Sequence, residues 1–169
     1  EGVDSSHSPE FTTLECYEAY ADQFVMADRM KEIILHCADL VGSRQIETEA
    51  GTINLDGEWK WLSVYPGLSE AVGTEITPDA DRDTLVAIAE KHQVKIDPKW
   101  DAEKLVVELF GEIVEPTLIQ PTFVLEHPVD ISPLAKRDPV RKHMTQRFEL
   151  FINGKEYANA FSELNDPLD

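Results

Sequence analysis

The sequence has few cysteines and no long apolar run. Its two cysteines, Cys16 and Cys37, match no metal-binding or redox spacing within the 169 residues. We expect both to be buried, reduced thiols of a cytoplasmic protein. No stretch of about 18 apolar residues is present, so no membrane-spanning helix is expected. The first residues have neither a basic start nor an apolar core, and they do not predict a signal peptide.

Basic residues are also scarce. The chain has 15 Lys and Arg against 33 Asp and Glu, which gives a net charge of −18. Contacts to nucleic-acid phosphates require Lys and Arg, so this surface is not expected to bind nucleic acid unaided. The charge is compatible with cationic ligands, with metal ions, or simply with high solubility.

The length and the 42% content of hydrophobic residues predict a globular domain with a sizeable core. Strand-like patterns occur at 10–20, 45–56, 59–65, 122–125 and in a final hairpin. Helical spacing occurs at 27–41, 83–92 and 101–114, with a short helix from Pro66 to about Gly73. We therefore expect an α+β fold, in which helices flank a mainly antiparallel sheet. Three parts are expected: 1–76, a small helical insertion at 77–115, and returning strands at 116–169.

The final hairpin raises a question about charge. The dipeptide at 153–154, Asn-Gly, is typical of a two-residue type I′ turn. Such a turn pairs Phe151 with Glu156 and predicts Glu149 opposite Ala158. The two glutamates then share one face as diagonal neighbours, roughly 7–8 Å apart. They could converge on one or two hard cations, or they could be two solvated surface side chains.

A second set of polar side chains follows on the same strand. Asn159, Phe161 and Glu163 are spaced by two, so they share one face of an extended strand. Strict alternation places that face opposite Glu156. A β-bulge at 157–158 would bring both sets onto one face, and bulges are common beside active sites.

Three segments of the chain resemble class II lysyl-tRNA synthetases. Residues 1–22, EGVDSSHSPEFTTLECYEAYAD, are similar to motif 2 of that family. Residues 121–136, PTFVLEHPVDISPLAK, are similar to the strand and loop that come later. Residues 147–167, RFELFINGKEYANAFSELNDP, resemble the late segment of the catalytic domain. The resemblance implies the class II catalytic-domain fold, with 77–115 at the place where this family carries its insertion.

The resemblance also implies an activity. It predicts ATP-dependent activation of lysine to lysyl-adenylate, followed by transfer to tRNA(Lys), with Mg²⁺ as the cofactor. The protein positions the substrates and neutralises developing charge, and no side chain is expected to react covalently. The parent enzyme is expected to be a cytoplasmic homodimer, with the dimer contacts outside this chain.

Site residues are implied position by position. The implied ATP-binding residues are Glu1, His7 and Phe11. The implied lysine-binding residues are Glu15, Tyr17, Asn159, Phe161 and Glu163. The implied metal ligands are Glu149 and Glu156, because Mg²⁺ takes one or two carboxylates and keeps several waters.

The chain also departs from the family pattern. Ser6 stands where the common pattern has an arginine that would face the ATP phosphates. The arginines of motifs 2 and 3, motif 1 and the OB-fold anticodon domain are not found in these residues. We therefore expect a segment of a synthetase that is inactive alone. The alternatives are the lysine-activating domain of a lysyltransferase fusion, a protein-lysylating paralogue, and a non-catalytic cation-binding module.

Overall fold

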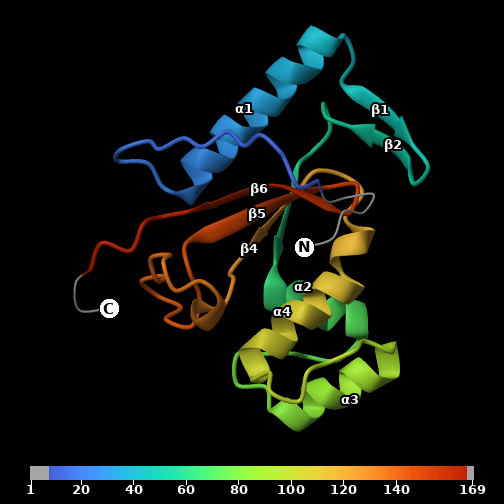
Figure 1. The fold of residues 1–169 in the computed structure, drawn as a ribbon, viewed down its shortest axis with the longest axis vertical. Coiled ribbons are helices and arrows are strands. Elements are labelled where there is room, and N and C mark those ends of the chain that lie inside the picture. Colours follow the sequence, from blue (N-terminus) through green and yellow to red (C-terminus); the bar gives the residue numbers. More distant parts are fainter. Residues whose placement is uncertain (1–7, 167–169) are drawn as a thin grey trace.

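A four-stranded sheet in the order β3-β4-β5-β6 is the centre of the fold, which a computed structural model describes for residues 8–166 (Figure 1). Its strands are β3 (Lys60–Ser63), β4 (Thr122–Leu125), β5 (Arg147–Ile152) and β6 (Lys155–Phe161). The pairs β4–β5 and β5–β6 are antiparallel, whereas β3–β4 is parallel. The α+β class is confirmed, but the sheet is mixed, because a long helical connection joins β3 to β4 and allows a parallel pairing.

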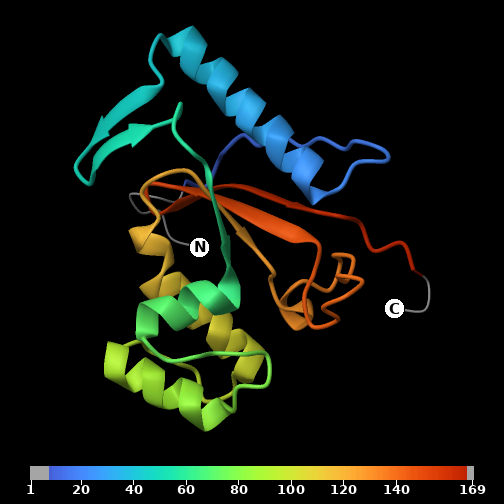
Figure 2. The same cartoon turned by 180° about the vertical axis from the view of Figure 1, so that it is seen from behind.

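The α-helices of residues 8–166 lie on the two sides of this sheet (Figure 2). They are α1 (Gln23–Val41), α2 (Val64–Val72), α3 (Arg82–His92) and α4 (Ala102–Ile113). A short hairpin of β1 (Gln45–Thr48) and β2 (Gly51–Asn54) follows α1, and two 3₁₀ turns are η1 (Glu115–Thr117) and η2 (Val129–Ile131). In both views α1 lies on one side of the sheet and α2, α3 and α4 lie together on the other. None of the helices within residues 8–166 is long and apolar enough to span a bilayer.

Capping side chains set where the helices begin. Asp22 accepts hydrogen bonds from the backbone N–H groups of Phe24 and Val25, so α1 starts several residues before the predicted position 27. Asp81 and Asp101 cap α3 and α4 in the same way. These two helices lie within one residue of the ranges expected from the sequence.

The two faces of β5 bury different side chains. Phe148, Leu150 and Ile152 belong to the apolar cluster that includes Ala27 and Ala38 of α1. Phe151, which has the opposite parity, packs with the cluster formed by α2, α3 and α4. The sheet therefore separates two cores, and the face that carries Phe151 also carries Glu149.

Two expectations for the first part of the chain are wrong. Residues 10–20 form no strand, and every side chain from 8 to 20 is exposed. An alternating pattern supplies a face but no hydrogen-bonding partner, and a strand requires both. Cys16 and Cys37 are exposed rather than buried. Cys16 lies in this segment without a strand partner, and the buried residues of α1 are the small Ala27 and Ala38.

Candidate functional site

The turn of the final hairpin has the predicted geometry. Asn153 and Gly154 have φ values of 55° and 67°, as a type I′ turn requires. Their N–H groups donate to the carbonyls of Ile119 and Leu118, so the turn is attached to the segment that follows η1. A side chain at 154 would also meet the backbone of Pro116 at 3.3 Å. This close approach explains why glycine occupies the second turn position.

A β-bulge interrupts the hairpin beyond the turn. Phe151 pairs with Glu156 as predicted, but the register then shifts, and Leu150 pairs with Ala158. Tyr157 lies between these two pairs as the additional residue. The predicted bulge at 157–158 is therefore confirmed.

The bulge corrects one predicted pairing and joins the two polar sets. Glu149 pairs with Asn159, not with Ala158. Directly paired residues lie on the same face of a sheet, so Glu149, Asn159 and Phe161 share the face that carries Glu156. The side chains of Glu156, Asn159 and Phe161 are exposed, whereas Ala158 is partly buried in the cluster on the α1 side.

Arg147 is the centre of the polar contacts on this face. Its Nη2 donates to Oε1 of Glu149, its Nε donates to Oδ1 of Asn159 at 3.1 Å, and its Nη1 donates to Oγ of Ser132 at 2.7 Å. The side chains of Arg147 and Glu149 are only 15% and 14% exposed. Sequence patterns did not identify Arg147 as a site residue. Its position two residues before Glu149, on the same face of β5, was the available signal.

A buried histidine, His127, lies near the second carboxylate oxygen of Glu149, the one that Arg147 does not contact. The Nε2 atom of His127 is 3.2 Å from the carbonyl oxygen of Val124 and 4.0 Å from Oε2 of Glu149. Burial, followed by the positive charge of Arg147, lowers the pKa of His127 to about 3. The ring is therefore neutral at pH 7 and donates its Nε2 proton to the carbonyl. Burial raises the pKa of Glu149, and Glu156 adds to this effect while Arg147 opposes it.

A further carboxyl group, Glu115 of η1, contributes to the acidity of this region. Burial raises its pKa to about 7, and the charges of Glu149 and Glu156 add to the shift. The sequence did not single out Glu115, because its proximity to the hairpin depends on the contact between the turn and the segment after η1.

The pKa of Glu115 predicts a pH dependence of stability. Its pKa is higher in the folded chain, about 7, than the ordinary value of 4.5. The folded state therefore binds this proton more tightly, and stability falls as the pH rises from 4.5 to 7. Glu115→Gln should raise the free energy of unfolding at pH 8 by on the order of 1 kcal/mol, reduced for partial exposure. The difference from the unsubstituted chain should vanish near pH 4.5.

This effect is measured by urea unfolding at several pH values in a buffer that contains a metal chelator. Glu58→Gln is the control, because Glu58 is an exposed glutamate outside the hairpin. An equal difference between Glu115→Gln and the unsubstituted chain at pH 4.5 and pH 8 would contradict the prediction.

The remaining predicted residues are not assembled with the hairpin. Phe11 and Tyr17 are 77% and 80% exposed, and Glu15 is exposed between them. Glu163 lies just beyond the end of β6, where its backbone pairs with Ala135, and its side chain is exposed. Glu1, Ser6 and His7 lie outside the described residues.

The carboxylates of the hairpin fit a magnesium ion better than a closed metal centre. Within residues 8–166, no three or more His, Cys, Asp or Glu side chains lie close enough to hold a metal ion. Glu149 and Glu156 share one face, and Glu156 is open to solvent. One open carboxylate beside a second that is only 14% exposed matches the preference of Mg²⁺, which takes one or two carboxylates and keeps several waters. The residues present therefore fit this ion.

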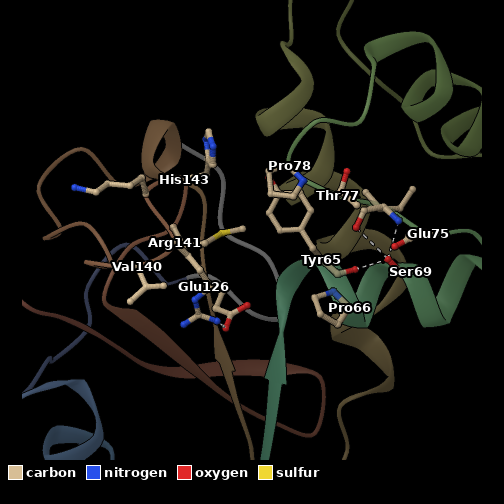
Figure 3. A pocket seen from close by; sticks show the side chains of 13 residues that line it. Tyr65, Pro66, Ser69, Glu75, Thr77, Pro78, Glu126, Val140, Arg141 and His143 are labelled. Carbon is tan, nitrogen blue, oxygen red and sulfur yellow. Dashed lines mark hydrogen bonds and ion pairs between the residues drawn. The ribbon is translucent and has the colours of Figure 1, made fainter.

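A hollow within residues 8–166 lies elsewhere. It has a volume of about 770 Å³. One wall is formed by α2 and the segment that follows it, and the other by the loop around Arg141 (Figure 3). Arg141 is held by ion pairs to Glu126 and Asp138 at its edge. None of the sequence-predicted site residues lines it. The candidate site is an open sheet face, not this hollow.

The comparison with protein families is consistent with this geometry. The family model for tRNA synthetases class II (D, K and N) matches residues 1–169. A lysine–tRNA ligase of Lactococcus lactis subsp. cremoris is 44% identical over 171 residues, and one of Staphylococcus aureus is 42% identical over 170. A lysine–tRNA ligase of Carboxydothermus hydrogenoformans is also 44% identical.

These matches cover 100% of this chain but only 34–35% of each relative. The chain thus spans about a third of the length of the curated relatives that it matches. Because the family model matches the chain from end to end, the chain belongs to the class II tRNA synthetases of the D, K and N group.

Proposed function

We propose that this chain is part of the catalytic domain of a lysyl-tRNA synthetase. That enzyme activates lysine with ATP and transfers the lysyl group from lysyl-adenylate to tRNA(Lys). The family and the names of the relatives support the reaction. The β-bulge between β5 and β6 carries the assignment, since it places Glu149 and Glu156 on the same face as Asn159 and Phe161.

The predicted residues of the hairpin, and Glu163 just beyond its second strand, each have a proposed role. Glu149 and Glu156 hold Mg²⁺, which, when bound, neutralises charge on the phosphate oxygens of ATP. Asn159, Phe161 and Glu163 form the lysine pocket, with Phe161 as its apolar wall. Glu163 accepts from the ε-ammonium group, which has three donors and no acceptor.

The other parts of the proposal follow the family resemblance. Residues 1–76 and 116–169 belong to the catalytic domain, and 77–115 is the helical insertion. The resemblance assigns ATP binding to Glu1, His7 and Phe11, and it assigns further contacts with lysine to Glu15 and Tyr17. The full-length enzyme is a cytoplasmic homodimer.

The function is tested by ATP–pyrophosphate exchange with the full-length protein that carries this chain. Exchange should depend on lysine and should be at the background level with aspartate or asparagine, the other two amino acids of the D, K and N group. Lysylation of tRNA(Lys) should follow. Exchange stimulated by aspartate or asparagine instead of lysine would overturn the proposal.

The metal assignment gives a separate prediction. Glu156→Gln should raise the Mg²⁺ concentration for half-maximal exchange by about tenfold or more, since even residues behind a metal ligand contribute this much to affinity. Lysine binding measured by calorimetry without ATP should not change. Glu58→Gln serves as the control for loss of one exposed carboxylate. An unchanged Mg²⁺ requirement for Glu156→Gln would remove Glu156 from the metal site.

A further inference from the structure

Arg147 connects the two halves of the candidate site. It contacts Glu149 of the proposed metal pair and Asn159 of the proposed lysine pocket. Its third contact is the hydroxyl of Ser132, which is itself buried, with 5% of its surface exposed. Partners on β5, on β6 and in the loop after η2 therefore fix the guanidinium from three directions.

These contacts determine how the Asn159 amide is oriented. Arginine has donors and no acceptor, so the amide oxygen of Asn159 must be the atom that faces Arg147. The NH₂ group of Asn159 is then left to donate from an exposed position on the face of the site. A donor cannot bind an ammonium group, but it matches a carboxylate.

Lysine would not replace arginine at position 147. Its ammonium group is a single point on a flexible stem, whereas the guanidinium is a planar fork that reaches several partners at once. With lysine, the contact to Glu149 would be kept as the strongest one, because it joins opposite charges. The amide of Asn159 would then be free to rotate.

We infer that Arg147 is a positioning residue for amino-acid recognition: it turns the Asn159 amide so that its NH₂ group meets the carboxylate of the bound amino acid. This inference rests on the proposed function, because it assumes that the face carrying Asn159 binds lysine. Glu163 and Asn159 then recognise opposite ends of the same ligand.

The test compares two ligands that differ by the carboxylate. Lysine and 1,5-diaminopentane are titrated into the full-length protein by calorimetry without ATP or metal, the second ligand by displacement of lysine. Arg147→Lys should weaken lysine binding by about tenfold or more, the usual cost of a lost hydrogen bond to a charged group. The Kd of 1,5-diaminopentane should stay within about twofold, because this ligand has no carboxylate.

Arg82→Lys is the matched control. Arg82 also uses several nitrogens, but its partners are the carbonyls of Trp100 and Pro98, away from the hairpin. The affinity of the Arg82→Lys protein for lysine should equal that of the unsubstituted protein. If Arg147→Lys weakens both ligands equally, or neither, the inference is wrong.

A second variant keeps the inference testable if Arg147→Lys does not fold. Asn159→Asp preserves a partner for Arg147 but replaces the NH₂ donor by a second carboxylate oxygen. Lysine binding should weaken by about tenfold or more, while 1,5-diaminopentane binding should not weaken. Tighter lysine binding in Asn159→Asp would show that Asn159 faces the ammonium end and would overturn the inference. Absence of lysine binding by the unsubstituted protein would instead refute the proposed function.

Discussion

Glu163→Gln in the full-length synthetase is expected to raise the KM for lysine by about a hundredfold and to leave the KM for ATP nearly unchanged. Glutamine keeps the shape of the side chain but removes its charge. When lysine covers Glu163, the ammonium group would face a neutral amide. Removing one partner of a buried charge pair costs roughly 2–5 kcal/mol, and each 1.4 kcal/mol is about tenfold in affinity.

Lysine-dependent ATP–pyrophosphate exchange measures both constants. Glu58→Gln is the control, and its KM for lysine should be unchanged, since Glu58 is an exposed glutamate before β3. Both lysine and 1,5-diaminopentane should bind more weakly to Glu163→Gln, because both carry the ammonium group. A lysine KM within about twofold of the unsubstituted enzyme would show that Glu163 is a solvated side chain.

Phe148→Ala should have the largest effect on stability. Phe148 has no exposed surface, and its ring meets Phe123 edge to face at a centroid distance of 5.2 Å. It lies in the cluster between the sheet and α1. Truncating a buried phenylalanine removes its transfer free energy and leaves a cavity, so the free energy of unfolding should fall by about 3–5 kcal/mol.

Urea unfolding of the 169-residue chain measures this loss. Tyr157→Ala on the neighbouring strand is the control, because Tyr157 is 59% exposed. It should change the free energy of unfolding by less than about 0.5 kcal/mol. A loss below about 1 kcal/mol for Phe148→Ala would mean that the cluster beneath α1 is not tightly packed in solution.

Local patterns predicted the helices well for an identifiable reason. Residues 83–92 were expected to be helical, and α3 spans Arg82–His92, because both the periodicity and its capping residue, Asp81, are local in sequence. The Asn-Gly turn was predictable for the same reason. The structure of the segment 10–20 was not predictable in this way. Its alternating pattern is local in sequence, but the partner that a strand requires would be distant in sequence.

The candidate site shows the same difference between features that are local in sequence and features that depend on distant contacts. The bulge could be inferred, because Glu156 and Asn159 would otherwise face opposite sides of one short strand. The contacts of Arg147 with Ser132 and Asn159 could not, since these residues are 15 and 12 positions away from Arg147 in the sequence. The position of Glu115 depends in turn on how the hairpin docks beside η1.

Because of the bulge, the number of residues in β6 determines which side chains face the site, much as a reading frame determines which codons are read. Removing Tyr157 would give a regular ladder in which Leu150 still pairs with Ala158 and Glu149 with Asn159. Every other side chain would stay on its present face, and only the added local twist would be lost. Removing Asn159 would instead turn Ala160 toward the site and Phe161 toward α1. We therefore expect a single-residue deletion in this strand to preserve the site when it removes the bulge residue. We expect it to disrupt the site when it reverses the faces of the residues that follow.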